Sequence, residues 1–139
     1  MNLINKRLSI FALLILGFLL SSCLKETPEG IVDITDGDLI LRGSFEDGAH
    51  PTSGIASVYR LDEKDYLAFE LFQTDSGPDL RVYLSKDNTN SDFIDLKRLI
   101  STSGAFHYEI PEGTIIEEYN HVLIWCRAFS VLFGSAEMN

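Results

Sequence analysis

Cysteine supplies the most reactive side chains in this sequence, and the chain contains two of them. Cys23 ends the run Leu20-Ser21-Ser22-Cys23, and Cys126 directly follows Trp125. A cysteine thiolate is a nucleophile that can be acylated, oxidised to a sulfenic acid or joined to another sulfur. If acylation consumes Cys23, Cys126 is the only thiol of the mature chain. An internal disulfide and a cysteine cluster that binds zinc are then both excluded.

The beginning of the chain has the form of an export signal. Lys6 and Arg7 precede an apolar run over residues 8–20, which is shorter than the roughly 20 residues of a spanning helix. Small residues before Cys23 resemble the bacterial lipobox, in which the cysteine is acylated and becomes the new N-terminus. Residues 24–27 resemble a surface-export tag of some Gram-negative lipoproteins. We expect an exported protein that is lipid-anchored to the bacterial cell envelope through Cys23, in the outer membrane. If residues 24–27 act as a surface-export tag, the protein is exposed at the cell surface.

The composition limits the possible partners and the number of domains. The chain carries 21 acidic and 11 basic residues, a net charge of −10. The only charged residues within 1–22 are Lys6 and Arg7, so loss of this segment would make the net charge more negative. Such a chain repels phosphate backbones, so nucleic acid is not an expected partner. A hydrophobic share of 45% is typical of a globular chain. We expect a signal peptide over 1–22, a lipid-anchored linker over 23–37 and a single folded domain over 38–139.

Alternation of apolar and polar residues dominates the rest of the chain and predicts β-strands. In residues 66–73 this alternation places Leu67, Phe69 and Leu71 on one face. Residues 93–100 fit either a helix or a strand, and we expect a strand. Clusters of turn-forming residues separate the segments, which indicates an all-β fold with a single antiparallel, sandwich-like domain. The expected strands cover 38–45, 54–61, 66–73, 80–85, 93–100, 106–110 and 122–133.

The last of these segments contains Cys126 and is apolar on both faces, which predicts one central, buried strand over 122–133. A strand turns neighbouring residues to opposite faces, so Arg127 should not contact the Cys126 sulfur. By periodicity alone Cys126 is a small buried hydrophobic residue. A free thiol in an oxidising compartment favours a functional role instead. Both interpretations remain open on the sequence pattern.

Other residue types give weaker signals. His50 lies in a loop between two expected strands, whereas His107 and His121 lie on strands without a paired ligand spacing and are expected to be structural. Residues 87–92 are rich in Asp and Asn but lack the EF-hand pattern, so a solvated turn is favoured over a calcium site. Neither a nucleophile elbow nor a phosphate-binding glycine loop is present. The sequence shows no metal site and no evident cofactor motif, and it leaves the cofactor unknown. We do not expect a stand-alone enzyme, whereas a redox protein is compatible with these residues.

Four blocks in order, at residues 50–54, 77–85, 122–126 and 133–136, resemble the DM-thirteen domain, also called the electron-transfer DM domain, over residues 38–137. The resemblance implies a small β-sandwich-like domain.

The same resemblance also bears on site residues. It implies that the cysteine beside the tryptophan, Cys126, is a redox centre, with His50 as a second candidate. Pro78, Asp79 and Trp125 support the motif, although Pro78-Asp79 also suits a turn before a strand. Multidomain relatives add haem-binding and cytochrome b-type domains. This chain carries no such domain, so its electron partner would be a separate protein.

Two functional hypotheses follow, and a structural envelope lipoprotein is the third possibility. In the first, an anchored electron-transfer protein cycles Cys126 between thiol and sulfenic acid or a mixed disulfide, completed by a separate electron carrier or thiol-redox protein. In the second, a surface module binds a glycan or a protein, and its cysteine is purely structural. The second predicts a pocket formed by the loops with His50, Asp79 and Asn88, above a buried Cys126.

Overall fold

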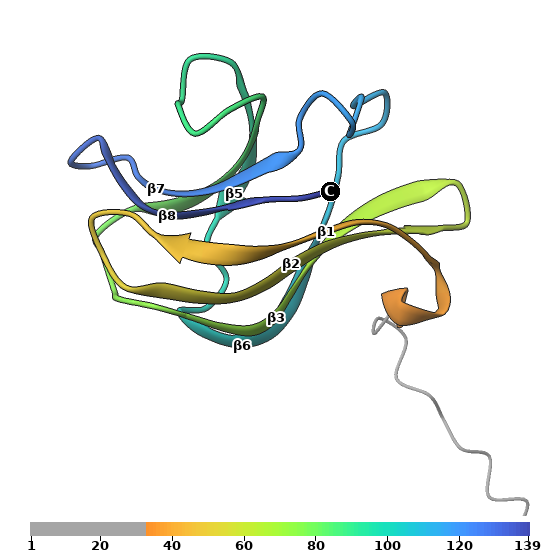
Figure 1. The fold of residues 1–139 in the computed structure, drawn as a ribbon, viewed down its shortest axis with the longest axis horizontal. Helices are drawn as coiled ribbons and strands as arrows, with labels where there is room; N and C mark the ends of the chain where they lie inside the picture. Colours follow the sequence, from red (N-terminus) through yellow and green to blue (C-terminus); the bar gives the residue numbers. More distant parts are fainter. Residues whose placement is uncertain (1–32) are drawn as a thin grey trace, which may run out of the picture. The chain divides into compact units, whose positions relative to one another are not determined.

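The structure is a computed structural model that describes residues 33–139 (Figure 1). The expected signal peptide, the lipidation site Cys23 and the linker up to residue 32 lie outside these residues. No helix within 33–139 is long and apolar enough to cross a membrane.

The described chain is all-β, as the alternation predicts, and its strands are joined in one antiparallel sheet. A short 3₁₀ helix, η1 (Ile34–Asp36), precedes them. The segment 93–100 forms a strand that ends at Arg98. The strands are β1 (Asp38–Asp47), β2 (Thr52–Leu61), β3 (Lys64–Thr74), β4 (Leu80–Ser85), β5 (Phe93–Arg98), β6 (Ser103–Glu109), β7 (His121–Cys126) and β8 (Val131–Glu137).

The sheet has the strand order β5-β4-β7-β8-β1-β2-β3-β6 and curls into two layers. Strand β1 belongs to both, because residues 38–44 pair with β2 and residues 45–47 pair with β8. Figure 1 shows β2, β3 and β6 in one layer and β5, β7 and β8 in the other. The core lies between the layers and includes the fully buried side chains of Leu67, Phe69, Phe72, Val82, Leu84, Val122, Ile124 and Cys126.

The two outer strands of this order, β5 and β6, are connected through a side chain. The Tyr108 hydroxyl accepts a hydrogen bond from the Ile100 N–H at 2.8 Å and donates one to the Arg98 carbonyl at 3.0 Å. Burial raises the pKa of Tyr108 to about 12, so its hydroxyl keeps the proton that it donates. The hydroxyl therefore fastens the open edge of the curled sheet near the loop 99–102.

The prediction of one strand over 122–133 is wrong, because the segment is a hairpin. Strand β7 ends at Cys126, residues 127–130 form an exposed turn, and Val131 returns as the cross-strand partner of Cys126. Ser130 has a φ of 53°, a left-handed conformation that closes the turn. The turn contains the apolar residues Ala128 and Phe129, and Phe129 is 70% exposed. It contains no Gly, Pro, Asn or Asp, so four of the residue types that most often mark a turn in a sequence are missing here.

The predicted face of Leu67, Phe69 and Leu71 is also wrong at its last member. The pairing of β3 with β6 shifts register between Phe69 and Phe72, and Leu71 there has a φ of 49° and is 82% exposed. Phe72 takes the core position instead. On the neighbouring strand Gly54 has a φ of 115°, and a Cβ there would lie 2.7 Å from the Phe72 Cα. The extra residue in β3 reverses the alternation beyond it.

Candidate functional site

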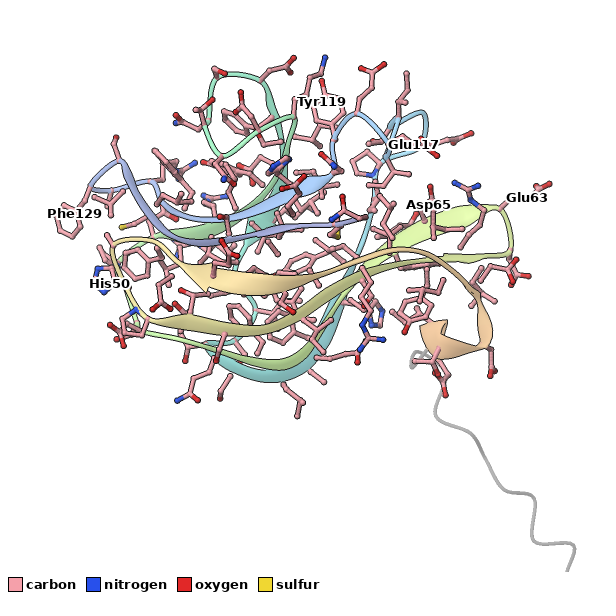
Figure 2. The ribbon with its side chains drawn as sticks, viewed as in Figure 1. His50, Glu63, Asp65, Glu117, Tyr119 and Phe129 are labelled. Carbon is pink, nitrogen blue, oxygen red and sulfur yellow. The ribbon has the colours of Figure 1, made fainter. Side chains whose placement is uncertain are left out.

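One end of the domain brings together four connections that are distant in sequence. They are the turn 48–51, the loop 75–79, the loop 99–102 and the turn 127–130. Backbone hydrogen bonds hold them to one another and to neighbouring strands. The Arg127 N–H donates to the Asp79 carbonyl, the Gly48 N–H to the Phe133 carbonyl on β8, and the Leu99 N–H to the Leu80 carbonyl on β4. Figure 2 shows His50 and Phe129 at this end. Because Cys126 is the last residue of β7 here, we call it the Cys126 end.

Cys126 is free and 0% exposed. Its cross-strand partners are Leu80 on β4 and Val131 on β8, and it belongs to the same core cluster as Leu80 and Phe133. In this conformation no external sulfur can reach the Cys126 thiol. Any reaction of the thiol with a partner therefore requires the Cys126 end to open locally.

His50 lies over this part of the core. Its ring stacks on Phe133 with the ring centroids 3.8 Å apart, and its Nδ1 atom lies 2.9 Å from Asp75 Oδ2. A Cβ at Gly77 would lie 3.0 Å from both Phe133 Cζ and Leu80 Cδ2, so these two side chains approach each other beneath the loop 75–79. His50 on Phe133, and Phe133 beside Leu80, form a group at the Cys126 end that we call the cap. Sequence reasoning missed Asp75, whose only signal is its place in a turn.

Asp79 fastens the loop 75–79 to the turn 127–130. Its carboxylate accepts hydrogen bonds from Arg127 Nε at 2.7 Å and Arg81 Nε at 2.9 Å, and Arg98 Nη2 lies 3.6 Å away. Burial alone would raise the pKa of Asp79, but the hydrogen bonds and charges of Arg81 and Arg127 outweigh it and hold that pKa below its usual value. Asp79 is thus an ionised structural anchor, and Pro78 before it is exposed.

Trp125 points to the opposite face of β7 from Cys126. It is the cross-strand partner of Arg81 and stacks near Tyr83, with centroids 6.5 Å apart. Tyr83 in turn stacks on Phe93 at 4.1 Å. Burial raises the pKa of the Tyr83 hydroxyl, and the charge of Asp95 adds to this effect. An aromatic row thus follows the outer face of the second layer, one residue away from the thiol along the chain.

The structure separates Asn88 from His50 and Asp79. Asn88 lies in the loop after β4, beyond the end of β4 that is distant from Leu80, and lines a shallow hollow with Ser44, Glu46, Ser135, Glu137 and Asn139. The pocket predicted from all three loops is therefore not formed by these residues.

The acidic side chains of the loop after β4 are engaged in local contacts. Asp87 accepts a hydrogen bond from the Thr89 N–H at 2.8 Å, and Asp92 accepts one from the Tyr119 hydroxyl at 2.9 Å. Across residues 33–139 no group of three or more His, Cys, Asp and Glu side chains is placed to hold a metal ion. Of the two strand histidines, His107 packs against Tyr66 and His121 contacts Asn120.

The four sequence blocks pack against one another at the Cys126 end. Blocks 77–85 and 122–126 contain the neighbouring strands β4 and β7. Blocks 50–54 and 133–136 meet where the Thr52 hydroxyl donates to the Phe133 carbonyl at 3.3 Å. A Cβ at Gly134 would lie 2.4 Å from the Thr52 side chain, which makes this contact specific to glycine. Three of the blocks thus contribute Leu80, Cys126 and Phe133 to one core cluster, and the fourth, 50–54, packs on Phe133.

Fold and site together define a small antiparallel β-domain with a single free thiol under one end of its sandwich. Residues 44–138 match the family model described as electron transfer DM13. The chain belongs to this electron-transfer family, as the resemblance of the four blocks indicated. No curated protein and no solved structure matches the chain.

Proposed function

We propose that this protein is an envelope-anchored electron-transfer lipoprotein whose redox centre is the Cys126 thiol. Family membership supports electron transfer as the general role. Cys126 is the only cysteine among residues 33–139. The observation that carries the finer proposal is that three family blocks contribute to the core cluster that contains Cys126, while the fourth packs on Phe133 of that cluster. The cap of His50, Phe133 and Leu80 would then control access to the thiol.

The chemistry that suits a lone thiol is exchange with a disulfide of a partner protein. Cys126 gives its proton to water, and its sulfur bonds to one sulfur of the partner disulfide. The partner S–S bond breaks, and its second sulfur leaves as a thiolate that takes up a proton. The Cys126 sulfur is thereby oxidised and the leaving sulfur is reduced by the same amount. A second partner thiol then attacks the mixed disulfide and restores the Cys126 thiol.

Exchange requires a locally opened state, since the thiol is fully buried. The cap lies at one end of the domain, where His50 belongs to the turn 48–51 and Leu80 and Phe133 lie near strand ends beside the loop 75–79 and the turn 127–130. Turns and loops open at lower free energy than core strands. We therefore expect Cys126 to react through local opening while the sheet remains folded.

This expectation can be tested on the full chain in a mild detergent, with glutathione disulfide as the probe. Wild-type protein should form a mixed disulfide at Cys126 in native buffer, detected by intact mass, and a dithiol reductant should reverse it. Cys126→Ala is the matched control, and any modification that it retains belongs to Cys23. Modification of Cys126 only at denaturant concentrations that unfold the sheet would overturn the redox role.

The lipid anchor is a separate part of the proposal and rests on the sequence around Cys23. Acyl chains on Cys23 would hold the protein firmly in the outer membrane. We expect wild-type protein to sediment with membranes and to incorporate a labelled fatty acid, and Cys23→Ala to do neither. Equal sedimentation and labelling of both proteins would contradict this assignment.

Complete burial of Cys126 is the observation that favours the second candidate, a surface binding module with a structural cysteine. In that case Cys126 would be protected to the same degree as the core strands. The glutathione experiment separates the two candidates, because only a redox role requires modification in native buffer.

A further inference from the structure

A group of arginines stands out on the surface of this acidic protein. Arg81, Arg98 and Arg127 gather around Asp79 at the Cys126 end, from β4, β5 and the turn 127–130. We call them the arginine patch. The side chain of Arg98 is 68% exposed and that of Arg127 is 54% exposed. The chain as a whole has 21 acidic and 11 basic residues, so three adjacent arginines are a marked local reversal of its charge.

The carboxylates nearby do not neutralise this patch. Asp79 faces all three arginines, and Asp95 Oδ2 lies 3.6 Å from Arg81 Nη1. Two other carboxylates at this end are engaged elsewhere: that of Asp75 is paired with His50, and that of Asp47 accepts a hydrogen bond from the Thr52 N–H. A guanidinium has five N–H donors, and the contact of Arg127 with Asp79 is made through Nε alone. Arg98 and Arg127 thus keep donors directed to solvent that suit bidentate binding of an external carboxylate.

Apolar groups lie beside these charges. Ile100 is 60% exposed and Phe129 is 70% exposed, in the loop 99–102 and the turn 127–130 respectively. Between the loops 75–79 and 99–102 is an open hollow of about 360 Å³, large enough for an apolar side chain of a partner. Its lining includes Ser76, Gly77, Leu80, Arg98, Leu99 and Ile100. Leu80 on this lining is the cross-strand partner of Cys126.

We propose that the arginine patch and this hollow form the docking surface for an acidic protein partner. Carboxylates of the partner would bind Arg98 and Arg127, and an apolar side chain next to them would enter the hollow beside Ile100. Mixed charged and apolar contacts are typical of protein interfaces. Negative charge over the rest of the chain would repel an acidic partner elsewhere, so the patch selects the docking end. This docking does not depend on the chemistry of Cys126, but it would place the partner beside the cap.

The probe for this proposal is a peptide of alternating glutamate and leucine, and the matched control peptide has glutamine in place of glutamate. The protein is the full chain in a neutral detergent. Trp125 is the only tryptophan of the chain and lies beside Arg81, so its fluorescence reports on the patch. We expect saturable binding of the glutamate peptide that weakens with salt, and none of the glutamine peptide.

Two pairs of variants locate the binding. Arg98→Gln with Arg127→Gln should weaken binding at least fivefold. Arg98→Gln alone leaves the Arg127–Asp79 contact intact, so the stability of the protein should not change. This variant should still lose part of the affinity for the glutamate peptide. Lys64→Gln with Lys86→Gln removes the same charge at other exposed positions and should leave affinity unchanged.

Equal weakening by both pairs of substitutions would overturn the proposal, because it would show a general charge effect. Preferential binding of inorganic phosphate or of phosphatidylglycerol vesicles would replace it with a phosphate-binding surface. Self-association that Arg98→Gln abolishes would replace the partner with a second copy of this chain. Failure of Cys126 to react with glutathione disulfide would leave the peptide result unaffected, so the two proposals fail separately.

Discussion

Replacing His50 by alanine is expected to increase the rate at which Cys126 is alkylated in native buffer about tenfold. The substitution removes the ring that stacks on Phe133 at 3.8 Å and the contact with Asp75 at 2.9 Å. An aromatic pair is worth about 0.5–1.5 kcal/mol, and about 1.4 kcal/mol corresponds to a factor of ten in an equilibrium. If the cap opens locally, the lost interaction energy changes almost entirely the equilibrium between the closed and the locally opened state, and the labelling rate follows the population of the opened state. Iodoacetamide labelling followed by intact mass measures the rate.

His107→Ala is the matched control for this experiment. His107 is also partly buried and packs against an aromatic ring, that of Tyr66, but it lies on β6 and outside the cap. Its replacement should leave the labelling rate unchanged. The cap model is wrong if His50→Ala labels at the wild-type rate. It is also wrong if the labelling rate rises only in proportion to a loss in global stability, measured by urea unfolding.

Replacing Gly134 by valine is expected to destabilise the domain strongly. A Cβ at this position would lie 2.4 Å from the Thr52 side chain and 2.7 Å from the Glu46 backbone carbonyl. The Glu46 carbonyl on β1 cannot retreat without breaking the pairing of β1 with β8, and the Thr52 side chain on β2 is itself buried. Overpacking of this kind costs about 1–3 kcal/mol and occasionally more, and we expect the upper end because two strands are displaced. The urea midpoint of unfolding measures the loss.

Ser135→Val provides the control for Gly134→Val. Ser135 is the next residue of β8 and is only partly buried, so a valine there adds the same side chain to the same strand. Strand propensity favours valine over both glycine and serine, and by propensity alone both variants should be neutral or stabilising. We expect Ser135→Val to unfold near the wild-type midpoint. A Gly134→Val protein with the same midpoint would show that blocks 50–54 and 133–136 do not depend on their close contact.

The alternation of apolar and polar residues correctly predicts most strands because a two-residue period is a local property of an extended chain. It predicts β4 with its observed bounds, residues 80–85. It fails at Leu71, where one extra residue in β3 turns the side chain outward to 82% exposure. A bulge depends on the pairing with β2 and β6, and the sequence of β3 alone does not reveal that pairing.

The candidate site shows the same division. Trp125 and Cys126 are recognisable from sequence because they are adjacent in a block that resembles the family pattern, and alternation correctly places them on opposite faces of β7. The contacts of His50 with Asp75 and of Asp79 with Arg127 span 25 and 48 positions of the chain. The spacing of the residues along the chain predicts neither contact. Both contacts form because strand ends from different hairpins meet at the Cys126 end.

The sequence by itself determined an all-β domain, an acidic chain, membership of the electron-transfer DM13 family and a lone thiol in its folded part. These properties depend on residue types and on the order of neighbouring residues, and both can be read directly from the sequence. Tertiary structure alone decided that β7 ends at Cys126 and that three arginines surround Asp79. It also decided that the thiol is buried in the core cluster that contains Leu80 and Phe133, on which His50 stacks. The physical reason is that turns, caps and charge clusters depend on which strand ends the curled sheet brings together.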